Sequence, residues 1–148
     1  MKRIFLLLAV LLVACQPATP LPPITAVLGE EFALTPGQTV TFSDAGLAIT
    51  FVSVSSDQRC PLEIECAASG PVSVTVAVRS GSDTPNEIIF QTFTDNNGRV
   101  PELEFEGMQD RAEFEGYLIR VESVLPFPQK SVSEIKDEYY LVSFTATK

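Results

Sequence analysis

The sequence predicts an all-β protein, a single β-sandwich or a small barrel of seven or eight antiparallel strands. Three observations predict this class. After Glu30, apolar and polar residues alternate with a period of two, β-branched and aromatic residues dominate these runs, and Gly, Asn and Asp separate them. The chain has 148 residues, 45% of them apolar and 20% charged, which fits one folded domain.

Each expected strand follows from its alternation and from the turn residues beside it. The clearest is the valine run, in which Val72, Val74, Val76 and Val78 share one face. The expected strands are Phe32–Leu34, Val40–Phe42, Leu47–Val54, Val72–Val78, Glu87–Thr94, Val100–Phe105, Tyr117–Val124 and Tyr139–Thr147. Only Gly107–Glu115 and Ser131–Glu138 are expected to hold a helical turn. This spacing is typical of an immunoglobulin-like sandwich or a small barrel.

The first fifteen residues have the pattern of an export signal. Lys2 and Arg3 precede Ile4–Ala14, an apolar run that is too short to span a bilayer. The run ends in Leu-Val-Ala-Cys, which resembles a bacterial lipobox. The resemblance implies that residues 1–14 are a cleaved signal peptide and that Cys15 carries a diacylglycerol thioether. The alternative is an ordinary cleaved signal with an incidental cysteine.

A lipid on Cys15 implies attachment to the cell membrane or outer membrane, facing the extracytoplasmic side. Two acyl chains hold a protein stably, whereas one holds it marginally. In Gram-negative lipoproteins an Asp after the cysteine favours the inner membrane, so Gln16 favours the outer one. The whole chain has a formal charge of −9, with 19 acidic and 10 basic residues. Such an acidic chain is not expected to bind nucleic acid or anionic headgroups.

Residues 15–29 are expected to form the lipidated end and a proline-rich tether, followed by the folded domain over 30–148. Four prolines lie within Gln16–Thr25, and proline favours an extended chain. At about 3.1 Å per residue, such a spacer lifts the domain off the headgroups. The alternative is an ordered edge segment that includes Ile24–Leu28.

Two further cysteines, Cys60 and Cys66, are expected to form a disulfide in an exported chain. Closing this short loop stabilises the fold by about 2–2.5 kcal/mol in the loop-entropy model. A zinc site is a poor alternative, because the chain has no histidine to complete four ligands. The spacing also differs from the C-x-x-C of redox sites.

The segment around these cysteines resembles a signature of uncharacterised bacterial secreted proteins and lipoproteins. The matching residues are Asp57, Arg59, Cys60, Pro61, Cys66 and Gly70. The chain departs from the signature at Gln58, where Ser is usual, and at Ala68, where Trp is usual. The resemblance implies no activity. Asp57 and Arg59 are expected to pin the loop by a salt bridge or by backbone hydrogen bonds. The alternative is a recognition loop with Asp57, Arg59, Pro61 and Gly70.

Two other groups of residues are candidate binding features. Glu102, Glu104 and Glu106 would share one face of the strand Val100–Phe105, either as a solvated face or as a weak Ca²⁺ site. Tyr139, Tyr140 and Phe127 would offer aromatic surface to a sugar or a protein, unless the strand alternation divides them between core and surface.

The sequence lacks the common catalytic sets. Without histidine there is no Ser-His-Asp triad, and neither phosphate-binding glycine motif is present. A hydrolase that uses carboxylates alone remains an alternative. The sequence therefore favours a non-catalytic, lipid-anchored module without a cofactor, which binds an envelope or extracellular protein. The second hypothesis is a Ca²⁺- or glycan-binding module that uses the acidic strand face.

Overall fold

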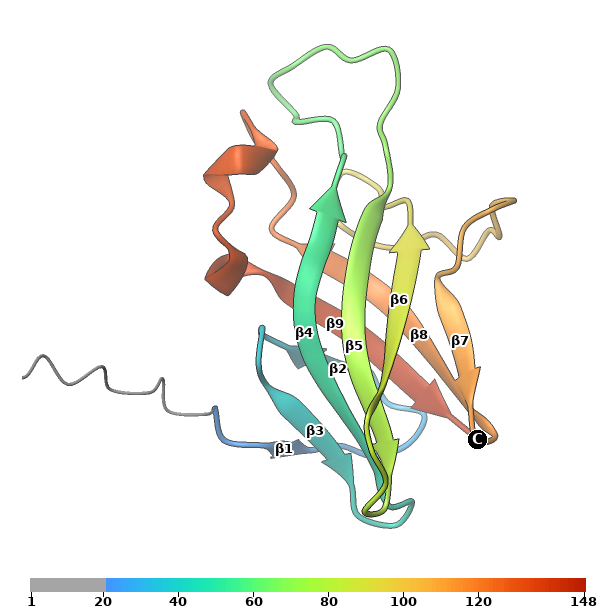
Figure 1. Cartoon of the computed structure of the whole chain (residues 1–148). Coiled ribbons are helices and arrows are strands. Elements are labelled where there is room, and N and C mark those ends of the chain that lie inside the picture. Colours follow the sequence, from blue (N-terminus) through green and yellow to red (C-terminus); the bar gives the residue numbers. More distant parts are fainter. Residues whose placement is uncertain (1–20) are drawn as a thin grey trace, which may run out of the picture.

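A computed structural model describes residues 21–148 as two β-sheets packed face to face (Figure 1). Nine strands and two short 3₁₀ helices follow one another along this part of the chain. Their bounds are β1 Ile24–Thr25, β2 Phe32–Leu34, β3 Thr39–Phe42, β4 Leu47–Asp57, β5 Val72–Ser80, β6 Asn86–Thr92, β7 Arg111–Phe114, β8 Tyr117–Leu125, η1 Val132–Glu134, η2 Asp137–Tyr139 and β9 Leu141–Thr147.

The topology is that of a sandwich, as the sequence predicted. The first sheet has the order β1-β3-β4-β5-β6 and the second β2-β9-β8-β7. All strand pairs in residues 21–148 are antiparallel except β1 and β3, which are parallel. Seven of the eight expected strands are present, some with shifted ends, and the helical turn expected within Ser131–Glu138 is confirmed by η1 and η2.

The core lies between the sheets and is built from the inward alternates of the strands. Val72, Val74, Val76 and Val78 are fully buried, as the valine run predicted. Phe144 of β9 stands at the centre, with its ring centroid 5.9 to 6.4 Å from those of Phe32, Phe51 and Phe90. These rings come from both sheets, so their contacts join the two layers.

The folded part begins earlier than Glu30. Ile24 and Thr25 pair with Val40 and Thr41, and Ile24 packs on the core together with Ala26 and Leu28. The alternative of an ordered edge segment therefore describes Ile24–Leu28 better than a free tether does. Because apolar side chains alternate in this segment, one of its faces packs on the core while its backbone pairs as an edge strand.

The prediction of a strand over Val100–Phe105 is wrong. The only ladder contact over these residues and Arg99 is an isolated bridge from Arg99 to Ser123, and residues 102–108 form an irregular segment with a bend at 102–103 and a turn at 106–107. Pro101 has no N–H to donate to a ladder. The strand forms instead at β7, Arg111–Phe114, where Gly107–Glu115 was expected to hold a helical turn, and it occupies the free edge of β8. A two-residue turn, Glu115-Gly116, joins β7 to β8, with positive φ at both residues.

Candidate functional site

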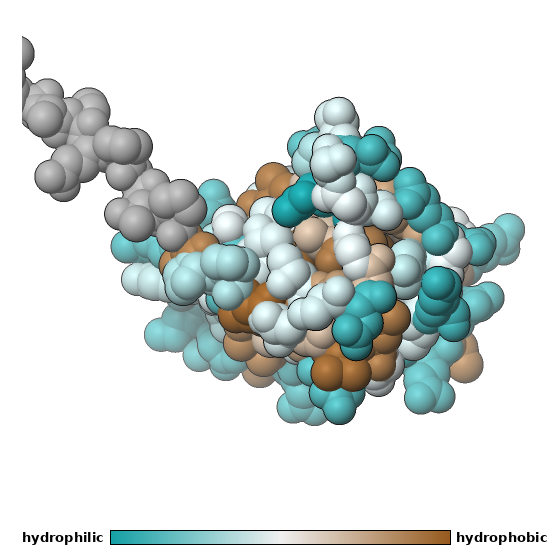
Figure 2. Space-filling model, turned by 90° about the horizontal axis from the view of Figure 1, so that it is seen from below, coloured by the Kyte–Doolittle hydropathy of each residue, from teal (hydrophilic) through white to brown (hydrophobic). Residues whose placement is uncertain are grey.

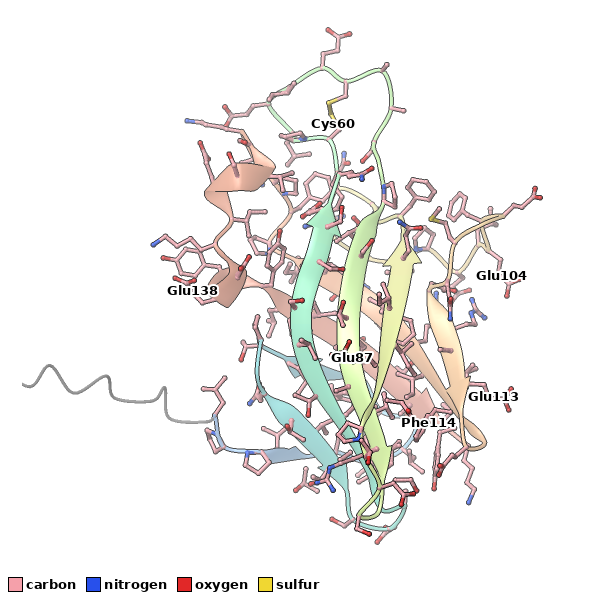
Figure 3. The ribbon with its side chains drawn as sticks, in the orientation of Figure 1. Cys60, Glu87, Glu104, Glu113, Phe114 and Glu138 are labelled. Carbon is pink, nitrogen blue, oxygen red and sulfur yellow. A yellow bond between two sulfur atoms is a disulfide. The ribbon has the colours of Figure 1, made fainter. Side chains whose placement is uncertain are left out.

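The loop between β4 and β5 projects from one end of the sandwich (Figure 1). It contains the expected disulfide, in which Cys60 and Cys66 are joined with their Cα atoms 6.1 Å apart (Figure 3). The turn between β3 and β4 lies at the other end of the molecule (Figure 1). The candidate recognition residues Asp57, Arg59, Pro61 and Gly70 all belong to this loop or its base.

Arg59 is buried at the base of the loop, with only 1% of its surface exposed. It forms a two-point ion pair with Asp57, in which Nε donates to Oδ1 over 2.9 Å and Nη2 to Oδ2 over 2.6 Å. The backbone N–H of Arg59 also donates to Oδ1 of Asp57. The pair thus has the planar, two-point geometry that guanidinium favours, and it closes the end of β4 onto the loop.

The same guanidinium joins the loop to the chain that follows β8. Its Nη1 donates to the Val124 carbonyl over 2.7 Å, its Nη2 to the Pro126 carbonyl over 3.0 Å, and it lies over the Phe127 ring. Four polar contacts therefore satisfy a charge that burial would otherwise make costly. Arg59 connects the two sheets at this end of the sandwich.

Tyr140, just before β9, completes this network. Its hydroxyl donates to Oδ2 of Asp57 over 3.0 Å. Burial, together with the negative charge of Asp57, raises the pKa of the Tyr140 hydroxyl well above its ordinary value. Tyr140 therefore stays a neutral hydrogen-bond donor over the physiological range.

Further hydrogen bonds hold the loop itself. The backbone N–H groups of Leu62 and Glu63 donate to the carbonyls of Pro128 and Gln129 over 3.1 and 2.9 Å. The Cys60 N–H donates to the Ser69 hydroxyl across the loop. These bonds and the disulfide restrict both arms of the loop, so it has a defined shape as well as a fixed base.

Gly70 permits the closing of the loop on its other arm. Its N–H donates to the Gln58 carbonyl over 2.9 Å, and a Cβ at this position would lie 2.6 Å from the Gln58 Cβ and 2.7 Å from its carbonyl oxygen. No side chain fits at that distance without a backbone shift. The glycine of the sequence signature is thus explained by close approach of two backbone segments.

The tip of the loop is exposed. All residues from Leu62 to Ser69 are open to solvent, and Leu62 and Ile64 are 47% and 51% exposed. Glu63 and Glu65 alternate with these aliphatic side chains. The loop therefore presents apolar surface on a backbone that is already ordered, an arrangement that lowers the entropy cost of binding.

The acidic residues expected on one strand face are not brought together. Glu102, Glu104 and Glu106 are exposed in the irregular segment before β7, and Glu104 pairs with Arg111 at 3.4 Å. Within residues 21–148, no group of three or more Asp, Glu, Cys or His side chains is placed to hold a metal ion. The premise of the Ca²⁺ hypothesis, three carboxylates on a strand, is therefore wrong.

The aromatic candidates are divided between core and surface. Tyr140 and Phe127 are buried in the Arg59 network, and Tyr139 is exposed with Lys136 over its ring. Sequence reasoning missed that Tyr140 binds Asp57, since these residues are 83 positions apart. The Pro126-Phe127-Pro128 motif was an available signal, because two prolines hold the chain extended beside the loop.

A shallow pocket of about 210 Å³ lies at the opposite end of the sandwich, between the segment after β1 and the turn between β3 and β4. Ala26, Val27, Leu28 and Phe42 supply apolar walls, and Asp44 lies at its border. Figure 2 shows this end of the molecule, where apolar side chains alternate with polar ones. The pocket is too small and open for a site that buries a drug-sized ligand.

Comparisons with protein-family models, with curated proteins and with solved structures found no match for this chain. Cys15, the expected lipidation site, and residues 1–14, the expected signal peptide, lie outside the described residues. No helix within residues 21–148 has the length and apolar character needed to cross a bilayer.

Proposed function

We propose that this protein is a non-catalytic lipoprotein, anchored through Cys15 on the extracytoplasmic side of the cell membrane or outer membrane. Its Cys60–Cys66 loop binds an envelope or extracellular protein. The observation that carries this proposal is an ordered loop that exposes Leu62 and Ile64 above a buried Arg59 network.

The anchor rests on the order of features at the start of the chain. A basic pair, a short apolar run and Leu-Val-Ala-Cys occur in the positions of a lipoprotein signal. The described chain begins at Leu21 and enters β1 at Ile24, so few residues separate Cys15 from the folded domain. At about 3.1 Å per extended residue, the roughly eight residues between them span on the order of 25 Å.

Binding by the loop rests on order combined with exposure. A mobile loop loses conformational entropy when a partner holds it, whereas this loop is already held by a disulfide, an ion pair and backbone hydrogen bonds. Two aliphatic side chains buried against a partner contribute about 1.5–3 kcal/mol each. The alternating Glu63 and Glu65 favour a partner with basic groups around an apolar centre.

The proposal is tested by photo-crosslinking of the full chain in intact cells. A photoreactive amino acid at position 64 is expected to capture a distinct protein, and the same group at position 118 serves as control. Leu118 is 41% exposed, close to Ile64 in this respect, but lies on β8 in the other sheet. With the photoreactive amino acid kept at position 64, the substitution Leu62→Asp should lower capture at least about tenfold, which corresponds to about 1.4 kcal/mol.

Three results would contradict the proposal. Absence of an adduct at position 64, or equal capture of the same protein at position 118, removes the loop as the binding site. An intact mass of the membrane-extracted chain without lipid on Cys15 removes the anchor. The first two results and the third are independent, so either half of the proposal can fail alone.

A further inference from the structure

The outer face of the strands β3 to β6 has few charges. Its outward residues are Thr, Ser, Ala and Gln, apart from Val52, Ile89, Arg79 and Glu87. The two charged residues have opposite sign, and both lie toward the end of the sheet away from the Cys60 loop. This surface, named here the neutral face, is turned toward the viewer in Figure 1.

The outer face of the other sheet is different. Asp110 accepts hydrogen bonds from Arg111 and Arg120, and Arg120 also pairs with Glu122 at 3.2 Å. The remaining acidic side chains lie mainly on this side and on the loops. In a chain of formal charge −9, the neutral face is therefore an exception that the composition does not predict.

On the neutral face, a well-exposed side chain lies next to one that is almost fully covered. Thr75 of β5 pairs with Ile89 of β6, and Ile89 is 57% exposed whereas Thr75 is 8% exposed. On the other flank, a β-bulge places Val52 and Ser53 together opposite Thr75, and Val52 is 39% exposed. Thr75 is thus a covered residue flanked by two more exposed aliphatic side chains.

We propose that the neutral face binds the same face of a second copy of this chain. Two copies of a strongly acidic protein repel each other over most of their surfaces, because like charges destabilise association. On the neutral face one Arg and one Glu cancel, and the remaining groups are uncharged. This face is where two copies approach at the lowest electrostatic cost.

The register makes the face complementary to itself. A two-fold axis parallel to the strands, between β5 and β6, places β5 of each copy over β6 of the other. Because Thr75 and Ile89 are paired in register, each exposed Ile89 then lies over the covered Thr75 of the second copy. Glu87 pairs with Ala77, two residues from Arg79 along β5. The Arg79 guanidinium, which donates to the Gly81 carbonyl over 2.7 Å, therefore has to turn along the strand to meet Glu87 of the second copy.

This arrangement also agrees with the proposed anchor, on which it does not depend. An axis parallel to the strands leaves the same ends of both copies pointing in one direction. Both chains then enter β1 from one side, so two anchors reach one membrane. An axis across the strands would point the two ends in opposite directions.

The test uses the full chain extracted from membranes in detergent and examined by sedimentation, together with co-purification of two differently tagged copies. The native protein is expected to be a dimer. Ile89→Lys should lower co-purification at least about tenfold, because it places an unpaired charge over Thr75 at the centre of the contact. Leu118→Lys, on the charged side, is the matched control and should leave the dimer intact.

A charge exchange makes the test specific for two copies. Glu87→Arg alone should weaken the dimer, because it brings two guanidinium groups of opposing copies together at the contact that Arg79 makes. The double variant Arg79→Glu with Glu87→Arg should restore the dimer. A monomeric native chain, equal loss with Leu118→Lys, or no recovery in the double variant would each overturn the inference. So would an Ile89-dependent complex with a different protein. Normal melting of each variant shows that its fold is intact.

Discussion

At the scale of single residues, the chemistry of arginine decides how the loop is held. Arg59 uses four of its five N–H groups on Asp57, Val124 and Pro126. Lysine has a compact ammonium with three donors and cannot make a planar two-point contact. A buried charge that loses its partners is strongly destabilising, so this position does not tolerate the exchange.

We therefore predict that Arg59→Lys lowers the free energy of unfolding by about 2–4 kcal/mol. Urea unfolding followed by tyrosine fluorescence measures it. The control is Arg99→Lys, because Arg99 pairs with Glu31 at 2.8 Å with both side chains largely exposed. Exposed pairs contribute less than about 1 kcal/mol, so the control should change little. Equal effects of the two substitutions would show that burial of Arg59 is unimportant.

The same residues show how far the sequence predicts the site. Asp57 and Arg59 are two positions apart, so their ion pair was accessible from local chemistry. Tyr140 and the carbonyls of Val124 and Pro126 were not, since they reach Arg59 and its partner Asp57 only after both sheets have assembled. The local motif thus predicted the ion pair between Asp57 and Arg59, but only the packing of the two sheets buries it.

At the scale of elements, alternation predicted strands where a neighbouring strand was free to pair. It was misleading at Val100–Phe105, where Leu103 and Phe105 alternate with acidic residues but are themselves exposed. The edge of β8 is taken by Arg111–Phe114, and Gln91 of β6 is bridged by Gln109. The Glu115-Gly116 turn was the overlooked signal, because it fixes a tight hairpin with β8.

The loop is the element whose stability is most open to test. Replacing Cys60 and Cys66 by serine removes the cross-link, and the loop-entropy model predicts a loss of about 2–2.5 kcal/mol. The chain should still fold, because Arg59, Gly70 and the bonds to Pro128 and Gln129 remain. Chemical denaturation measures the loss. A variant that unfolds completely would show that the disulfide, and not the Arg59 network, holds this end of the sandwich.

At the scale of the whole molecule, charge is distributed unevenly over the two layers. One sheet carries the neutral face, and the other carries the ion pairs around Asp110. The composition gives only the net charge, and it does not say which face holds the acidic groups. That division appears once the register of each strand is known. It separates the neutral face from the side of the molecule that holds the ion pairs around Asp110.

Asp110 connects this charged side to the pH dependence of stability. Burial opposes its ionisation, but hydrogen bonds from Arg111 and Arg120 outweigh burial and hold the pKa of Asp110 below the ordinary 3.8. A carboxyl with a lowered pKa stabilises the fold above the pKa of the unfolded chain, and this stabilisation is lost as the pH falls through the folded value.

Asp110→Asn should therefore lower the free energy of unfolding at about pH 7 by about 1–2 kcal/mol, since it removes charge-assisted hydrogen bonds. The difference from the native chain should begin to shrink as the pH falls below about 4, because the Asp110 carboxyl of the unfolded chain then binds a proton before that of the folded chain does. Thermal melting at about pH 7 and about pH 3 measures both differences. Glu113→Gln, which changes an exposed carboxyl on β7 three residues after Asp110, is the control. A difference for Asp110→Asn that stays constant over this range would mean that its charge does not stabilise the sheet.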